Sequence, residues 1–329
     1  MPSAIQISPL FKTLFTALLT LILVQTVNAE LQLQRITIAT VSTSNLRGFE
    51  RRYTHWFGYE VRERGRVSTA LAKSWGAPKS AGRRYVLMSS EGSPDVFLRA
   101  VQAPRVKGYE AMTTWGWNAI EIIANDPIAL REKFNRSPFK VIGEPKGLNS
   151  YPSIVAFQLV GPDNEVIYLT GETGDPEKSP LPLPSGDVDR IFIMVVAGPD
   201  IEALLDWYST KFDMPRGPAR QVPIRVVQVA QNLTAEDLVG IGLIRLNEHG
   251  NLIEFDGYSA AHTGPRPFHA GHLPPGVGIT SFSVPDLDEL ELLYLQPPAY
   301  YHGKAYDGRR SATVRGPIGE LIELVEYRR

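Results

Sequence analysis

The stretch GPIGELIEL, residues 316–324, joins a tight turn to a short apolar strand that contains a single strand acid, Glu323. The same arrangement occurs three more times, as SPDVFLRAV (93–101), GPDNEVIYL (161–169) and EHGNLIEFD (248–256). Aligning the turns gives four residues at one shared position: Phe97, Tyr168, Glu254 and Glu323. Because self-similarity at a period of roughly 70 to 85 residues marks a duplicated structural unit, we expect four copies of one unit.

Each unit is expected to open with an apolar strand, at residues 36–43, 118–124, 191–197 and 278–284. Apolar residues at helical spacing follow the first and third strands. The second and fourth are followed by the helix-start residues Asp126 and Asp286. Further strand-like stretches complete each unit. The pattern therefore predicts an α+β fold built from four βαβββ units.

A proline-rich segment, DPEKSPLPLPSG at residues 175–186, separates the second unit from the third. Its four prolines cannot donate to a strand ladder or continue a helix. We therefore expect an N-terminal domain at residues 30–174 and a C-terminal domain at residues 187–329, each containing two units.

The first 29 residues form a separate segment whose only charged side chain is Lys12. Its apolar core and the small residues before Glu30 are typical of a cleavable signal peptide. An uncleaved anchor is the alternative. The signal peptide predicts a periplasmic or secreted protein, with no membrane contact after cleavage.

Composition narrows the class of partner. Apolar residues make up 43% of the chain and charged residues 21%, and the net charge is -1. The sequence has no long run of basic residues, and phosphate binding normally needs a clustered basic surface, so a nucleic-acid partner is excluded. A small organic molecule is the expected ligand. The chain contains no cysteine, which removes disulfides, thiol nucleophiles and cysteine-bound metals. A homodimer is left open.

Several stretches resemble the vicinal oxygen chelate superfamily, which includes glyoxalase I, extradiol dioxygenases and bleomycin-resistance proteins. They are RYTHWFGYEV (52–61), DWYSTKFDM (206–214) and the strand endings HGNLIEF and GELIELVE. The resemblance implies that two βαβββ units pair into a cupped sheet with the active site inside the cup. Four units then imply two tandem cups.

The resemblance also implies metal ligands on the first and last strand of a unit. Glu254 and Glu323 match the last-strand pattern. The first-strand positions contain no histidine and fall at or next to Ile38, Asn118, Ile193 and Ile279. The two glutamates could therefore hold a divalent metal such as Mg²⁺ only weakly, and a metal-free site is the alternative.

Strand alternation places each glutamate on the face opposite its apolar neighbours, either inside a cup or toward water. If Glu254 and Glu323 share a cup, repulsion and burial should raise the pKa of at least one of them. That carboxyl would then be a general acid or base.

The N-terminal half lacks these acids and is interpreted as a structural half. Tyr168 and Asn118 are its candidate substrate-binding side chains. His272, three residues after His269 in the loop at residues 263–276, is the candidate for replacing a missing strand histidine in the C-terminal cup.

Two functions follow. The favoured one is an exported lyase, isomerase or dioxygenase-like enzyme that acts on a small, fairly apolar molecule through Glu254 and Glu323. The alternative is a metal-free binding or sequestering protein of the bleomycin-resistance type, which the missing first-strand histidines favour.

Overall fold

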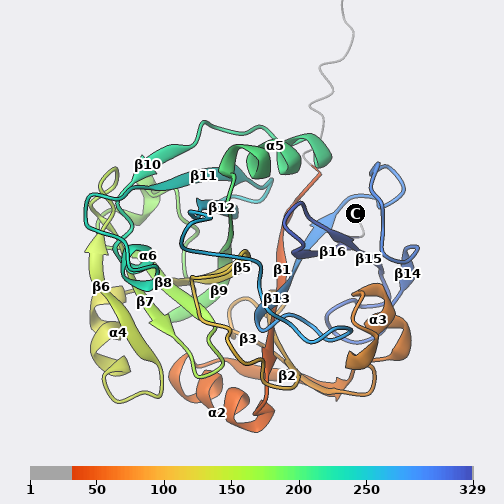
Figure 1. The fold of residues 1–329 in the computed structure, drawn as a ribbon. Helices are drawn as coiled ribbons and strands as arrows, with labels where there is room; N and C mark the ends of the chain where they lie inside the picture. The colour runs from red at the N-terminus through yellow and green to blue at the C-terminus, as the bar shows by residue number, and fades with distance from the viewer. Residues whose placement is uncertain (1–31, 328–329) are drawn as a thin grey trace, which may run out of the picture. The chain divides into compact units, whose positions relative to one another are not determined.

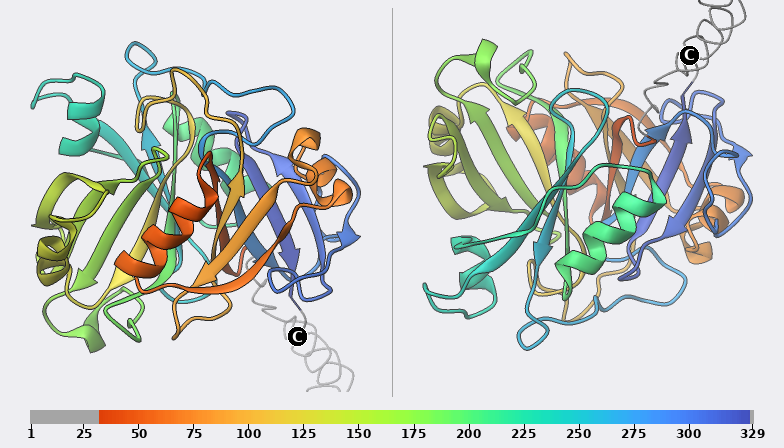
Figure 2. Two further views of the ribbon diagram at one scale, coloured as in Figure 1. Left: turned by 90° about the horizontal axis from the view of Figure 1, so that it is seen from below. Right: turned by 90° about the horizontal axis from the view of Figure 1, so that it is seen from above.

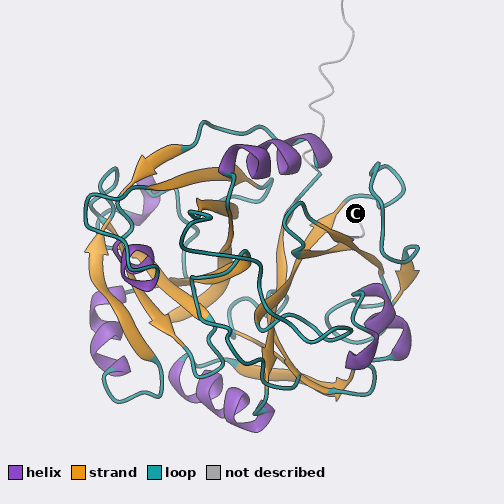
Figure 3. Cartoon of the chain, viewed as in Figure 1, coloured by secondary structure: helices purple, strands orange, loops and turns teal. Residues whose placement is uncertain are grey.

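Two curved eight-stranded sheets form the fold in the computed structural model, which describes residues 32–327 (Figures 1 and 3). The first sheet has the order β14 (Ala299–Tyr300), β15 (Arg310–Arg315), β16 (Leu321–Glu326), β13 (Gly276–Val284), β1 (Arg35–Thr43), β4 (Phe97–Gln102), β3 (Arg84–Ser89) and β2 (Glu60–Arg66). The second has the order β10 (Arg220–Val222), β11 (Val239–Arg245), β12 (Leu252–Gly257), β9 (Val188–Gly198), β5 (Gly116–Ala124), β8 (Val166–Glu172), β7 (Ile154–Val160) and β6 (Lys140–Gly147). The predicted α+β class with cupped sheets is confirmed.

The units combine differently from the expected division into halves. β1 pairs with β13 and β5 pairs with β9, both antiparallel. The first sheet therefore joins the first and fourth units, and the second sheet joins the second and third. The segment 175–186, which contains the 3₁₀ turn η2 (Pro176–Lys178), is a connection within the second sheet. Just past it, the amide of Asn125 bonds the carbonyl of Asp187 at 3.0 Å, which brings β9 alongside β5.

Three helices lie on the sheet faces that point away from the cups: α2 (Leu46–Trp56), α4 (Pro127–Phe134) and α5 (Ile201–Lys211). Figure 2 shows α2 from below and α5 from above, each crossing the strands of a sheet. Each helix is preceded by a capping residue whose side chain accepts hydrogen bonds from backbone N–H groups of the first helical turn. The capping residues of α2, α4 and α5 are Asn45, Asp126 and Asp200 respectively. Their apolar stripes enter one core that both sheets share.

The fourth unit differs from the prediction, because the chain after Asp286 forms turns instead of a helix. Leu287 and Leu290 are nevertheless buried in the shared core. The amide of Leu287 bonds the carboxylate of Glu326 at 3.0 Å, and the amide of Asp288 bonds that of Asp286 at 2.8 Å. These side-chain acceptors replace the helical bonds that would otherwise organise the segment.

Two equivalent hydrogen bonds connect the sheets across the shared core. The Tyr53 hydroxyl on α2 donates to Glu165 in the turn before β8, at 3.3 Å. The Tyr208 hydroxyl on α5 donates to Glu320 in the turn before β16, at 2.9 Å. Both bonds span 112 residues, so the two halves of the chain repeat the same long-range contact.

This contact explains the repeated Gly-Pro-x-x-Glu sequence of the two turns. A Cβ atom on Gly161 would lie 2.0 Å from a carboxylate oxygen of Glu165, and one on Gly316 would lie 2.0 Å from Glu320. Each glutamate folds back over its own turn, so only glycine fits at the first position.

Two short helices lie on the cup side instead. α3 (Thr69–Ser74), followed by the 3₁₀ turn η1 (Pro78–Ser80), packs on the inner face of the first sheet. α6 (Arg225–Ala230) packs on the inner face of the second. We call these inner faces the first cup and the second cup.

The predicted signal segment, residues 1–29, lies outside the described residues. Between residues 32 and 327, no helix combines the length and apolarity that spanning a membrane requires.

Glu320→Gln should flatten the pH dependence of stability. Burial raises the pKa of Glu320 to about 7, whereas the unfolded chain loses this proton near pH ~4.3. The free energy of unfolding therefore falls as the pH rises between these values. Glutamine keeps an oxygen for the turn amide and cannot ionise, so the loss between pH 5 and 8 should shrink by on the order of 2 kcal/mol.

Urea denaturation at both pH values measures this difference. Glu132→Gln, on the exposed side of α4, is the matched control and should leave the pH dependence unchanged. A wild-type pH dependence in Glu320→Gln would contradict the prediction.

Candidate functional site

Glu323 is fully buried in the first cup. Its neighbours on β16, Ile322 and Leu324, pack in the shared core on the opposite face, as the strand alternation predicted. One carboxylate oxygen accepts bonds from the Trp75 indole at 2.7 Å and the Tyr306 hydroxyl at 2.8 Å. The other accepts from Arg99 at 2.9 Å and from the Ser281 hydroxyl at 2.5 Å.

Arg99 on β4 is equally buried, with 2% of its surface exposed. Its Nε donates to Thr40 at 2.9 Å and its Nη1 donates to Tyr306 at 2.7 Å. The guanidinium carbon lies 4.5 Å from the centre of the Trp75 ring, which α3 carries into the cup. These contacts fill the first cup with the protein's own side chains.

The charges of this pair offset the effect of burial. Burial by itself would raise the pKa of Glu323, but Arg99 and the bonds from Ser281, Trp75 and Tyr306 hold it below its usual value. Glu323 therefore stays ionised and has no free lone pair for a proton or a ligand. The predicted acid–base role of Glu323 does not fit these surroundings.

Strand register corrects the sequence alignment in the first unit. Thr40 lies opposite Arg99, and Ser281 lies opposite Glu323. Because β1 and β13 pair symmetrically, Arg99 is the counterpart of Glu323, and Phe97 lies two residues short of that position.

The residues present do not fit the divalent metal that the resemblance implies. A guanidinium and a carboxylate that neutralise each other are not a metal donor set. Within residues 32–327, moreover, no group of three or more His, Cys, Asp or Glu side chains is arranged to hold a metal ion.

Glu254 lies in the second cup, so the structure does not bring the two predicted glutamates together. Asp256, two residues further along β12, and Glu121 on β5 face the same cup, because the residues that alternate with them pack in the shared core. Tyr168 on β8 and Tyr258 just after β12 are the nearby aromatic residues. The sequence analysis missed Glu121 and Asp256.

The three acids of the second cup act on one another. Burial raises the pKa of Glu121 to about 7, and burial together with Glu121 raises that of Asp256 to about 7. Burial and the charges of Asp256 and Glu121 raise the pKa of Glu254 well above its usual value. These acids are therefore easily protonated near neutral pH.

The rest of the second cup is apolar and partly open to solvent. Small side chains line it, among them Ala119, Val195 and Ala197, and α6 covers one end. Glu254 is partly exposed, and Leu243, opposite it in register on β11, is 37% exposed. This part of the inner face is therefore partly exposed to solvent.

Two other predicted site residues lie elsewhere or are already bonded. The Asn118 amide donates to the carbonyls of Thr114 and Gly116 at 2.9 Å, which organises the loop before β5. The loop of His272 packs against η1, where the Lys79 amide bonds the Gly271 carbonyl at 2.8 Å. His272 therefore lies beside the first sheet and does not supply a ligand to the second cup.

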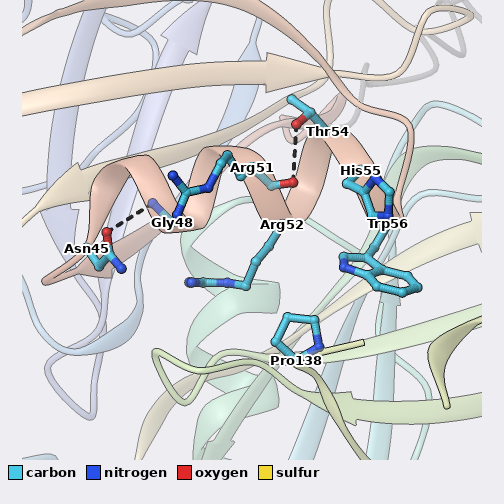
Figure 4. A pocket seen from close by; sticks show the side chains of 8 residues that line it. All are labelled: Asn45, Gly48, Arg51, Arg52, Thr54, His55, Trp56 and Pro138. Carbon is cyan, nitrogen blue, oxygen red and sulfur yellow. Dashed lines mark hydrogen bonds between the residues drawn. The ribbon is translucent and has the colours of Figure 1, made fainter. Parts of the chain in front are cut away.

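The surface of the described chain is also hollowed beside α2, outside both cups (Figure 4). Arg52 on this helix pairs with Asp163 at 2.6 Å, and the Asn45 side chain accepts from the amide of Gly48. These polar groups hold the helix in place. The hollow has a volume of about 560 Å³ and is lined by Asn45, Gly48, Arg51, Arg52, Thr54, His55, Trp56 and Pro138.

Comparison with known proteins gives the fold a name. No protein-family model matches the chain, and no curated protein matches its sequence. Glyoxalase I from Zea mays is similar in structure, with a TM-score of 0.58 at 16% identity over 89% of this chain and 92% of that one. A putative dioxygenase from Bacillus subtilis has a TM-score of 0.53 at 10% identity over 91% and 86%. The chain has the vicinal oxygen chelate fold.

Arg99→Met should strongly destabilise the protein, because it leaves Glu323 buried without its cation. Removing one partner of a buried pair typically costs about 3–5 kcal/mol. The double variant Arg99→Met/Glu323→Met should recover most of that loss, since apolar side chains then replace both charges. Urea denaturation of the three proteins measures it, and a single variant as stable as wild type would contradict the prediction.

Proposed function

We propose that this chain binds a small, partly apolar organic molecule on the inner face of the second sheet, without a metal. One observation supports the proposal above the others: Glu254 is a partly exposed acid on an inner face whose remaining side chains, apart from Glu121 and Asp256, are largely apolar. Sites of this kind, apolar with a few polar groups, are typical of small-molecule binding.

The difference between the cups supports the same assignment. In the first cup, Trp75 and Tyr306 cover the Arg99–Glu323 pair, and all four residues are buried. In the second, Gln158, Ile241 and Glu254 keep part of their surface exposed. The second cup is therefore the binding half, and the first cup stabilises the fold. This proposal keeps the substrate-binding role predicted for Tyr168 and gives Glu323 a structural role in place of the predicted catalytic one.

A second candidate is acid–base catalysis at Glu254, as in a lyase or isomerase. The pKa of Glu254, which burial and the charges of Asp256 and Glu121 raise well above its usual value, favours it, because a carboxyl that holds its proton more tightly is a better general acid. Glu254→Gln should then abolish turnover, by at least 100-fold in kcat, while uncharged ligands still bind. Equal loss of binding and turnover would favour the binding function alone.

Export of the protein, to the periplasm or the exterior, belongs to the same proposal and rests on the sequence of residues 1–29.

Leu243→Trp should block the binding site. Residue 243 lies opposite Glu254 in register, so an indole there would cover the exposed part of the second cup. Ligand-observed NMR with a panel of small neutral, cationic and anionic molecules identifies binders, and at least tenfold weaker binding is expected in this variant. Leu293→Trp, at a position that is 92% exposed in a loop, is the control. The proposal would be contradicted if every ligand that binds the wild type bound both variants with unchanged affinity.

A further inference from the structure

The second cup contains three acids, Glu121, Glu254 and Asp256, and none of them forms an ion pair with a basic side chain of residues 32–327. Asp256 is only 1% exposed, and its Oδ1 has no hydrogen-bond partner among the described residues. Glu121 accepts one bond, from the Thr170 hydroxyl. Only burial and other acids raise the pKa of Glu254 and Asp256, and no basic side chain acts on either. Charged groups this deep in a protein are normally paired.

The arginine whose charge acts on Tyr258 is engaged elsewhere. Arg266 acts on Tyr258, but it donates to the carbonyls of Trp117 at 2.8 Å and Val277 at 2.9 Å. Its guanidinium also lies 5.1 Å from the centre of the Tyr109 ring. Arg266 therefore holds the loop after β12 and does not neutralise the acids.

The first cup shows how this architecture holds a cation. There the guanidinium of Arg99 lies against the carboxylate of Glu323 and over an aromatic ring. By register, the counterparts of these two residues in the second cup are Tyr168 and Glu254, since Glu121 lies opposite Tyr168 and Val195 lies opposite Glu254. The second cup retains the carboxylate and the aromatic residues but lacks the cation.

We infer that the second cup binds a small organic cation, a primary amine or guanidinium on a short apolar skeleton, through Glu254, Asp256 and Glu121. The inference rests on the proposed function and specifies its ligand class. An ammonium group supplies up to three donors, which suits acceptors on three side chains. Tyr168, Tyr258, Ala119 and Val195 belong to the apolar cluster on the same inner face, against which the cation and its skeleton would pack.

This ligand class also fits better than the alternatives. An anion would meet three carboxylates. A divalent metal needs several oxygens converging at 2.0 to ~2.6 Å, and no such group of acids exists within residues 32–327. An organic cation is larger and tolerates acceptors that are further apart.

The test is isothermal titration calorimetry of the full chain with probes that share one skeleton. Hexylammonium and hexylguanidinium are compared with hexanol, hexanoate, MgCl₂ and CaCl₂. We expect at least one organic cation to bind tenfold or more tightly than hexanol. Because the acids must ionise to pair, binding should release protons below about pH 7, and affinity should rise as the pH rises from 5.5 to 8.

Variants assign the binding to this cluster. Asp256→Asn and Glu254→Gln should each weaken cation binding at least tenfold and reduce proton release, whereas hexanol binding persists. Glu132→Gln on α4 is the matched control with unchanged binding. Melting of the unliganded variants at pH 8 should occur at the wild-type temperature or above it, because each variant removes a buried repulsion; this shows that lost binding is not unfolding.

Equal affinity for hexanol and both cations would overturn the inference and leave the proposed function standing. Tight stoichiometric binding of Mg²⁺ or Ca²⁺ in place of the organic cations would also overturn it, as would no cation binding at all. If every probe that binds has the same affinity for the Leu243→Trp variant as for the wild type, the proposed function itself is contradicted.

Discussion

The ion pair between Arg99 and Glu323 is the interaction on which the division of roles in this fold depends. Two buried charges need strong mutual pairing and further hydrogen bonds to offset their lost hydration. Here Trp75, Tyr306 and Ser281 supply those bonds, and they come from three different parts of the chain. The cup is thereby filled, and the strands of the first and fourth units are joined across it.

In the second cup, within residues 32–327, the buried acids have no arginine partner equivalent to Arg99. Its sheet has the same strand order and the same position for Glu254, but the counterpart of the arginine is Tyr168. The acids therefore lower their charge by taking up protons, and their pKa values rise. Unbalanced polar groups of this kind destabilise a fold and persist most often where a ligand compensates them. Duplication followed by divergence has left the charges of the first cup paired and the acids of the second cup without an ion pair among the described residues.

Much of the architecture was predictable because the repeat and the alternation of apolar residues within each strand can be read directly from the sequence. The strand alternation follows from neighbouring residues, and the four units follow from a repeat of the turn-and-strand pattern along the chain. The fourth helix was predicted from Asp286 and does not form; in that segment the amides of Leu287 and Asp288 donate to the side chains of Glu326 and Asp286. Glu121 and Asp256 were visible in the sequence as charged residues within apolar strands, Glu121 on the first strand of the second unit and Asp256 two residues after Glu254.

The sequence by itself determined which residues alternate inward and how often the unit repeats, because both are properties of neighbours along the chain. Only the tertiary structure decided that the first unit pairs with the fourth, since hydrogen bonds between β1 and β13 join segments more than 200 residues apart. The same pairing separates Glu254 from Glu323 and places Arg99 against Glu323. Which carboxylate is neutralised and which remains available depends on that long-range choice of strand partner, and no local pattern contains it.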